Sequence, residues 1–350
     1  MNGGGKLDLK ILWTISGSMG TLADIEMLKN AKSFGIEVVT ADVEDKDTVG
    51  FIATGKKYIV PKVKDSKYIN ALLEICKIEK ITTIIPQYTD ELILISENAD
   101  RFKDLGIKVL VTEDIEKLRI ANNKGELYQF FSNRSFIPKY RIVSSIDSIK
   151  AAVQELGYPN MPVCIKPING EGGKGFRIIT KEKIDIFNEP VGSAKVNLEA
   201  YIDQLKALSK IPELLVSEYL SEKEYSVDCV CKNGITYFCI PRQRIETTMG
   251  VSTVSLIEKN DELIEYSKEI ISSLNLSYNI NIQFKYTKGG MPMLIEINPR
   301  VSGSLVANYG AGINMLEEAL KLAYKIPTTE INIKWGTKML RYWSQIFTKV

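Results

Sequence analysis

Histidine is absent from all 350 residues of this chain. Its absence excludes Ser-His and Cys-His catalytic triads, zinc sites with imidazole ligands, and acid–base catalysis by imidazole. Five cysteines are present, but no two of them form a C-x-x-C pair, and we expect free thiols in a reduced interior. Any metal ion is therefore expected to have oxygen ligands, which points to Mg²⁺ or a similar hard cation.

Neither sign of charge dominates, because 45 lysines and arginines stand against 43 aspartates and glutamates. Since there is also no long basic stretch, we expect no nucleic-acid partner. No apolar run approaches the roughly 20 residues that a membrane-spanning helix needs, and the start MNGGGKLDLKILW lacks a secretory pattern. We therefore expect a cytoplasmic protein without a membrane partner, long enough for two or three domains.

The first 113 residues alternate short apolar runs with amphipathic stretches. Predicted strands occupy residues 9–16, 36–43, 56–63, 81–88 and 106–113. Strands that alternate with helices favour an α/β fold with a parallel sheet. The GSMG turn at residues 17–20 resembles a dinucleotide-binding fingerprint but lacks the full G-x-G-x-x-G, so we interpret it as a tight turn between a strand and a helix.

A glycine-rich stretch, CIKPINGEGGKGFRII, occupies residues 164–179 and follows a short apolar run. Four of the six residues from 170 to 175 are glycine, directly after Lys166. Glycine lets a backbone bend sharply or approach a ligand closely, and exposed N–H groups beside an ammonium suit a phosphate chain. A hairpin with a glycine-rich turn fits the same letters, so the stretch by itself leaves both interpretations open.

Two late predicted strands carry oxygen-bearing side chains in the segment NIQFKYTKGGMPMLIEINPRVSGS. Gln283 lies on the first strand, Glu296 on its hairpin partner, and Asn298 just beyond, so that the three can converge at one end of a β-ribbon. Mg²⁺ accepts this set of hard ligands and takes phosphate oxygens in its remaining positions. Arg300 follows as a fixed cation that can brace a transferring phosphoryl group. The alternative is a solvated hairpin with exposed polar residues.

Order and spacing of these motifs resemble the ATP-grasp superfamily, most closely the synthetase halves of the carbamoyl-phosphate synthase large subunit. The resemblance runs from the strand at Lys10 to about residue 325. It is most specific in the segments IKPINGEGGKG, VSEYLSEKEYSVD and NIQFKYTKGGMPMLIEINPRVSGS.

The resemblance implies a fold of three parts. An N-terminal Rossmann-like domain would span residues 7–113, and the ATP-grasp domain would span residues 114–330. Within the latter, a small lid of about residues 137–215 would face a larger C-terminal lobe, with ATP held by both. Residues 331–350 would form a C-terminal extension.

The resemblance also implies ATP and Mg²⁺ (or Mn²⁺) as ligands and assigns roles to individual residues. Lys124 and Lys166 would touch the ATP phosphates, and residues 170–175 would close over them. The ATP-binding set would be Lys124, Lys166, Gly170, Gly172, Gly173, Lys174, Gly175, Glu218, Tyr219, Leu220 and Glu224. Gln283, Glu296 and Asn298 would hold the metal, and Arg300 would contact the transferred phosphate or the acyl phosphate.

The implied chemistry is phosphorylation of a carboxylate followed by attack of an amine on the acyl phosphate, with release of ADP and phosphate. It needs no histidine, because positioning and charge neutralisation supply most of the catalysis. The expected partners are a small carboxylic acid, an amine and, as an option, a second copy of the chain in a homodimer.

Two departures from the resembled family bear on the substrate. The carbamoyl-phosphate synthase halves carry a histidine soon after a Met-Gly pair, whereas this chain reads TTMGVSTVS with Ser252 at that place. The chain also holds one ATP-grasp unit rather than two. Both facts favour an organic acid over bicarbonate. A bicarbonate-activating subunit and a catalytically idle ATP-binding regulator stay as alternatives.

Two further segments are candidates for binding the substrates. Arg242 or Arg244 could hold the acid carboxylate through a planar guanidinium, and since they alternate on a strand, only one can face the ligand. Surface ion pairs are the alternative for both. The segment PQYTDELI places residues 89–91 at a strand end, where open α/β sheets bind ligands, although a helix N-terminus explains these residues equally well.

Overall fold

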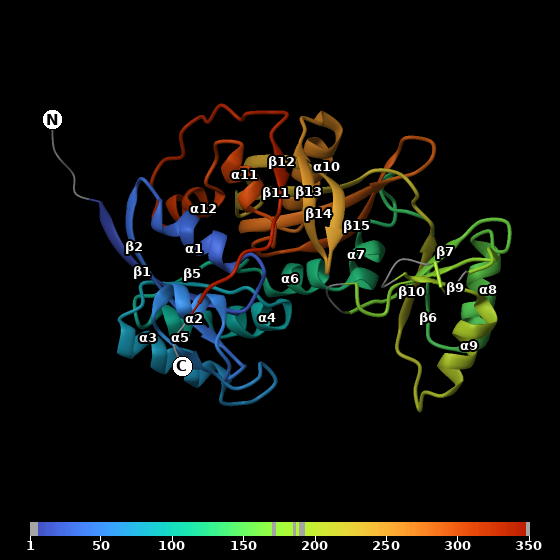
Figure 1. Cartoon of the computed structure of the whole chain (residues 1–350), viewed down its shortest axis with the longest axis horizontal. Coiled ribbons are helices and arrows are strands. Elements are labelled where there is room, and N and C mark those ends of the chain that lie inside the picture. The colour runs from blue at the N-terminus through green and yellow to red at the C-terminus, as the bar shows by residue number, and fades with distance from the viewer. Residues whose placement is uncertain (1–5, 170–172, 185–186, 189–192, 348–350) are drawn as a thin grey trace. The chain divides into compact units, whose positions relative to one another are not determined.

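The computed structural model describes residues 6–169, 173–184, 187–188 and 193–347. These residues form two compact units, in which segments distant along the chain come together. The first unit comprises residues 1–121, 225–283 and 297–350, and the second comprises residues 122–224 and 284–296. The predicted lid lies wholly within the second unit. Figure 1 labels many of the elements of both units.

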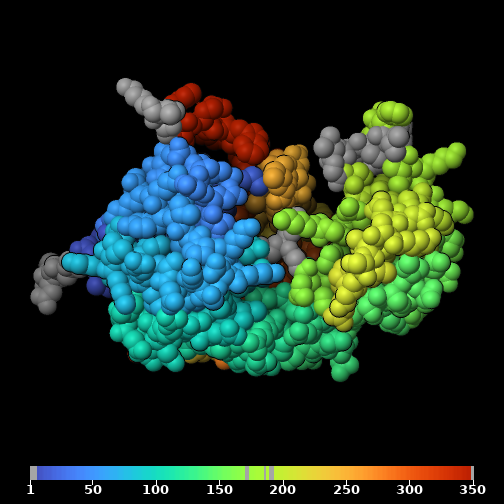
Figure 2. Space-filling model, turned by 90° about the horizontal axis from the view of Figure 1, so that it is seen from below, coloured from blue at the N-terminus to red at the C-terminus, as the bar shows by residue number. Residues whose placement is uncertain are grey.

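The first sheet of the first unit is parallel, as the alternating pattern predicts. Its strand order is β3-β2-β1-β4-β5, so the direction of winding reverses between β1 and β4. The strands are β1 (Leu7–Thr14), β2 (Phe34–Asp42), β3 (Tyr58–Ile59), β4 (Thr83–Ile85) and β5 (Lys108–Val109). The helices that follow them are α1 (Thr21–Lys29), α2 (Val49–Thr54), α3 (Tyr68–Glu79), α4 (Thr89–Glu97) and α5 (Ala99–Lys103). In the space-filling view these residues form one continuous surface, coloured blue to teal (Figure 2).

A second, six-stranded sheet has the order β15-β14-β11-β12-β13-β16. Its strands are β11 (Glu224–Lys232), β12 (Ile235–Thr248), β13 (Val251–Ile257), β14 (Tyr278–Tyr286), β15 (Pro292–Asn298) and β16 (Lys338–Leu340). The helices along this part of the chain are α10 (Asp261–Ser273), α11 (Val306–Gly310) and α12 (Met315–Ala323), whereas α6 (Ile115–Asn122) follows β5. Asn233 and Gly234 turn β11 into β12 with φ of 48° and 76°, the positive values that a two-residue hairpin turn requires.

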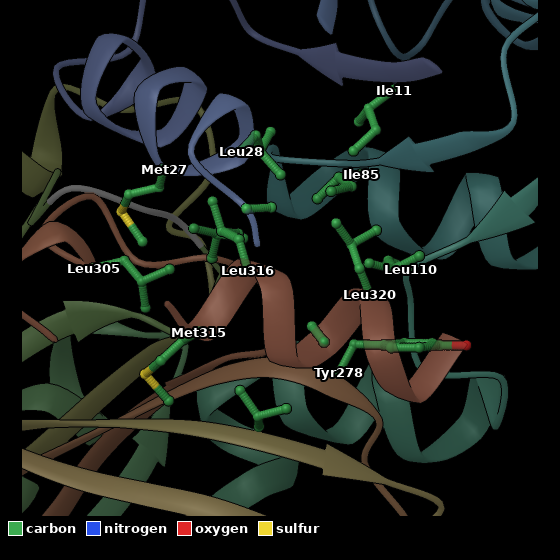
Figure 3. Close-up of a cluster of buried hydrophobic side chains, with 14 of the residues drawn as sticks. Ile11, Met27, Leu28, Ile85, Leu110, Tyr278, Leu305, Met315, Leu316 and Leu320 are labelled. Carbon is green, nitrogen blue, oxygen red and sulfur yellow. The ribbon is translucent and has the colours of Figure 1, made fainter. Parts of the chain in front are cut away.

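Helix α12 packs against the parallel sheet in an apolar core of the first unit. Asn314 caps the helix, since its side chain accepts a hydrogen bond from the Glu317 backbone N–H at 3.3 Å. Buried Leu316 and Leu320 then lie one turn apart on a single face. Figure 3 shows both pointing toward Leu28 of α1 and the strands of the parallel sheet. The same core includes side chains of β11, β12 and β13.

The second unit contains a five-stranded sheet of order β6-β10-β7-β8-β9. Its strands are β6 (Tyr140–Val143), β7 (Val163–Pro167), β8 (Arg177–Ile179), β9 (Lys195–Val196) and β10 (Leu214–Glu218). Helices α8 (Ile146–Glu155) and α9 (Leu198–Lys206) share one apolar cluster with these strands, and α7 (Lys124–Phe130) precedes them in the chain.

The helices of the described residues are all too short or too polar to cross a lipid bilayer.

Candidate functional site

Strand β7 carries Lys166 on the face of its sheet that points away from the apolar cluster. Val163 and Ile165 are fully buried in that cluster, so Cys164 and Lys166 alternate onto the opposite face. The Lys166 ammonium donates to the Ile295 carbonyl at 3.1 Å and lies 5.6 Å from the centre of the Tyr128 ring. The strand thus holds this lysine in a single place with a carbonyl and an aromatic face.

Helix α7 brings a second lysine to the same group of residues. Asn123 caps the helix by accepting hydrogen bonds from the backbone N–H groups of Gly125 and Glu126, and Lys124 is the first helical residue. The Lys124 backbone N–H also donates to the Ile168 carbonyl at 3.1 Å. The start of α7 is therefore tied to the chain that enters the glycine-rich segment.

Glu296 completes this cluster. Its Oε2 atom lies 3.2 Å from Lys124 Nζ, and the side chains are 25% and 13% exposed. Burial and, to a smaller extent, the positive charge of Lys124 lower the pKa of Lys166 to about 8, with Glu296 opposing the shift. Two ammonium groups and one carboxylate therefore share a poorly solvated space in the second unit, which can accept a further anion.

The glycine-rich segment is only partly visible, because Gly170 and Gly172 lie outside the described residues. Gly173, Lys174 and Gly175 are exposed, and the two glycines have φ of 72° and 76°. A Cβ atom on Gly175 would lie 2.8 Å from Pro167 Cγ. Gly175 is thus required both by its backbone angle and by its contact with the end of β7.

The end of β10 and the residues that follow it make further contacts within the second unit. Glu218 binds the start of β6, since its carboxylate accepts from the Lys139 N–H at 2.8 Å and its own N–H donates to the Lys139 carbonyl. Leu220 is buried. Glu224 lies 3.7 Å from Lys285, whose ammonium is also 6.0 Å from the centre of the Tyr219 ring.

The other predicted residues belong mostly to the first unit. Gln283 and Asn298 lie on β14 and β15, which are neighbours in the six-stranded sheet, and the division between the units separates them from Glu296. Arg300 donates to the Val301 carbonyl at 3.0 Å and to Asn298 Oδ1 at 3.4 Å. No three His, Cys, Asp or Glu side chains among the described residues gather as a metal site.

Arg242 and Arg244 lie on the same face of β12, so the expectation that they alternate is wrong, and burial rather than alternation distinguishes them. Arg242 is 1% exposed and donates to the Asp228 carboxylate at 3.2 Å and to the Ser252 hydroxyl at 2.8 Å. Arg244 is half-buried and donates to the Ser226 hydroxyl at 3.3 Å and the Gly250 carbonyl at 3.1 Å. Only Arg244 therefore has surface that a ligand could touch.

The segment at the end of β4 serves as a helix N-terminus. Glu91 is fully buried and accepts hydrogen bonds from the backbone N–H groups of Gln87 and Tyr88, and from the hydroxyls of Thr14 and Tyr68. Of the two interpretations left open by the sequence, this arrangement favours capping of α4 for Glu91.

Sequence reasoning missed three residues of the second unit: Tyr128, Cys164 and Lys285. A signal existed for each of them. Tyr128 lies one helical turn after Lys124, and Cys164 and Lys285 lie two residues from Lys166 and Gln283 on their strands, hence on the same faces.

Comparison with known proteins connects this geometry to a family. Residues 210–340 match a model described as ATP-grasp in the biosynthetic pathway with Ter operon, and residues 15–110 match a PylC-like N-terminal domain. The carbamoyl phosphate synthase large chain of Clostridium acetobutylicum is 24% identical over 271 residues, which are 74% of this chain. The matched part is only 23% of that relative's length.

Several solved structures share the fold. The ADP complex of an N5-carboxyaminoimidazole ribonucleotide synthetase has a TM-score of 0.69 at 16% identity, covering 94% of this chain and 80% of that one. Biotin carboxylase from Campylobacter jejuni has a TM-score of 0.66 at 17% identity, covering 93% and 74%. The L-amino acid ligase from Bacillus licheniformis has a TM-score of 0.61 at 14% identity, covering 91% and 74%.

Proposed function

Since the chain is an ATP-grasp protein with a PylC-like N-terminal domain, we propose that it is an ATP-dependent carboxylate–amine ligase. It phosphorylates a small carboxylic acid with ATP, couples the acyl phosphate to an amine, and releases ADP and phosphate. We propose that it acts in the cytoplasm and, like the 2-oxoglutarate carboxylase domain described as a dimer, forms a homodimer.

The observation that carries this proposal is the pair of lysines beside Glu296. The two ammonium groups repel each other in a poorly solvated space, and this repulsion contributes to the lowered pKa of Lys166. A polyphosphate anion relieves that repulsion and receives charge-assisted hydrogen bonds from both groups. The aromatic face of Tyr128 and the Ile295 carbonyl keep Lys166 in position for it.

The residues present suit Mg²⁺ as the accompanying ion. Glu296 supplies a carboxylate, and Asn298, two residues further on the same face of β15, supplies an amide oxygen. Gln283 on the neighbouring strand supplies a second amide oxygen. When bound, the ion would neutralise charge on the phosphates during transfer. The Lys124–Glu296 contact holds the carboxylate in place before the ion arrives.

In the first step an oxygen of the acid carboxylate attacks the γ-phosphorus of ATP. The bond from that phosphorus to the bridging oxygen breaks, and ADP leaves. Lys124, Lys166 and Arg300 offset the negative charge of the transferring group. In the second step the amine attacks the acyl carbon, the bond from that carbon to the phosphate oxygen breaks, and the amine loses a proton.

Arg244 is the residue we propose for orienting the acid carboxylate. Arg242 is enclosed between Asp228 and Ser252, whereas Arg244 keeps exposed surface on the same strand. A guanidinium binds a carboxylate with two parallel hydrogen bonds. Arg242 would then act indirectly, by holding the strand that presents Arg244.

Activation of bicarbonate is a second candidate, favoured by the similarity to a carbamoyl phosphate synthase large chain. Ser252 weighs against it. This residue is fully buried between Arg242 and Ser304 at the place where the resembled halves carry a histidine.

A screen of ADP release tests the proposal. Acids, including bicarbonate, and amines are supplied in pairs with ATP and Mg²⁺, and ADP is measured. We expect ADP formation that depends on both an acid and an amine and that is lost in Lys166→Ala. Wild-type protein that neither binds ATP nor releases ADP with any pair would refute the proposal.

A further inference from the structure

We propose that Asn281 is a positioning residue that fixes the orientation of the Gln283 amide. Asp228, Asn281 and Gln283 are joined by successive hydrogen bonds, which we call the relay, and buried Asp228 determines which way each amide in it points. The inference rests on the proposed function, because Gln283 is a metal ligand only if the chain binds a metal–nucleotide complex. All the residues involved belong to the first unit.

The relay begins at Asp228 on β11, whose side chain is 1% exposed. Its carboxylate accepts hydrogen bonds from three donors: Asn281 Nδ2 at 2.7 Å, Asn308 Nδ2 at 2.9 Å and Arg242 Nε at 3.2 Å. The permanently charged guanidinium provides the counterion inside the fold. Because a carboxylate can only accept, the part of Asn281 that faces Asp228 must be its NH₂ group.

That constraint passes along β14 to Gln283. With its NH₂ group committed to Asp228, Asn281 can offer only its carbonyl oxygen on the other side. This oxygen accepts from Gln283 Nε2 at 3.3 Å. The NH₂ group of Gln283 is thereby committed as well, and Oε1 is the atom left to bind a cation.

Reversal of either amide would be unfavourable. A flipped Asn281 would turn its oxygen against the carboxylate of Asp228 and its NH₂ group against that of Gln283, so that two acceptors and two donors would face each other. Asn281 is itself only 2% exposed, so it has almost no surface with which to touch a ligand. Its contribution to metal binding is therefore through Gln283.

The same strand offers a matched control. Asn279 lies two residues before Asn281, on the same face of β14, and is 5% exposed. Its Nδ2 donates to the Met315 carbonyl at 3.1 Å, which does not belong to the relay. Asn279→Leu and Asn281→Leu therefore make the same chemical change, the loss of one buried amide, on the same face of β14.

The test is a titration of Mn²⁺ followed by electron paramagnetic resonance, in the presence of the non-hydrolysable ATP analogue AMP-PNP. Wild type, Asn281→Leu and Asn279→Leu are compared, and the affinity for the analogue without metal is measured separately. We expect Asn281→Leu to weaken Mn²⁺ binding by about 10- to 100-fold, the loss typical when a group supporting a metal ligand is removed. Metal-free analogue binding should not change, and Asn279→Leu should bind Mn²⁺ as wild type does.

If the leucine substitutions acted only by loosening the fold, both would weaken Mn²⁺ binding alike. The thermal unfolding of each variant is therefore recorded. If Asn281→Leu does not fold, Asn281→Ser replaces it, because the shorter hydroxyl can face Asp228 but does not reach Gln283. Wild-type binding of Mn²⁺ by Asn281→Leu or Asn281→Ser would overturn the relay and leave the proposed function standing. Wild-type protein that binds no Mn²⁺ with the analogue would overturn both.

Discussion

Lys124 and Glu296 form an ion pair of 3.2 Å in the second unit, with both side chains largely shielded from solvent. One is a proposed phosphate ligand and the other a proposed metal ligand. In the described state they neutralise each other. Binding of a metal–nucleotide complex would exchange this contact for contacts with the ligand, so the pair keeps two charged groups oriented in advance.

We therefore predict that Glu296→Gln lowers kcat by about a hundredfold or more, the loss typical of removing a charge-stabilising group from an active site. The free energy of unfolding should fall by no more than about 1 kcal/mol, since the pair is partly exposed. Exposed Glu222→Gln is the matched control and should keep wild-type kcat. Unchanged ADP release in Glu296→Gln would remove Glu296 from the proposed site.

The pKa of Lys166 predicts a pH dependence of nucleotide binding. Its value of about 8 lies below the ordinary 10.5 because burial and Lys124 disfavour the charged form. Affinity for AMP-PNP should therefore fall as pH rises through 8, where the ammonium is lost. Lys166→Arg, which stays charged, should flatten this dependence between pH 7 and about 9.5.

The lowered pKa of Lys166 also makes the free energy of unfolding depend on pH, in the direction opposite to that of nucleotide affinity. Between pH 8 and 10.5 the unfolded chain binds more protons at Lys166 than the folded chain does, so this group makes folding more favourable as pH rises through that window. Equal AMP-PNP affinity of wild type at both ends of the window would show that Lys166 does not contact the phosphates.

Substitution of Arg242 should lower the stability of the fold, whereas substitution of Arg244 should weaken binding of the acid. Arg242→Met leaves Asp228 buried without its counterion, and we expect the free energy of unfolding to drop by about 3–5 kcal/mol. Arg244→Lys should instead raise KM for the acid by an amount equivalent to about 2 kcal/mol, with KM for ATP unchanged. Chemical denaturation and steady-state kinetics with the acid varied measure the two effects. Wild-type KM for the acid in Arg244→Lys would place the carboxylate elsewhere.

Alanine variants of two glycines distinguish the effect of backbone strain from the effect of steric contact. Gly173 and Gly175 both have positive φ, but only at Gly175 would a Cβ atom meet another side chain, at 2.8 Å from Pro167. Alanine at either position should cost about 1–2 kcal/mol of local strain. Gly175→Ala should weaken AMP-PNP binding more than Gly173→Ala. Equal affinities of the two variants would show that the approach to Pro167 has no part in binding.

Local patterns in the sequence were enough to predict much of the fold. Alternating apolar runs predicted the parallel sheet, because such a pattern depends on neighbouring residues. The cluster of Lys124, Lys166 and Glu296 required the family resemblance, since these residues are far apart in the chain and no local rule joins them.

The environment of Arg242 could not be predicted, because it depends on a partner on another strand. Arg242 and Arg244 lie two residues apart and therefore on the same face of β12, but the sequence does not show which of them meets a buried partner. The burial of Asp228 decides that question. The spacing of Tyr128 from Lys124 and of Lys285 from Gln283 was visible in the sequence, but their contacts with Lys166 and Tyr219 are visible only in the folded chain.

The most direct test of the account follows one oxygen atom. The acid found by the ADP screen is labelled with ¹⁸O in its carboxylate and incubated with ATP, Mg²⁺ and the amine, and the released phosphate is examined by mass spectrometry. An acyl-phosphate pathway predicts that each phosphate released during coupling carries one labelled oxygen from the acid. Unlabelled phosphate alongside a coupled product would contradict the account.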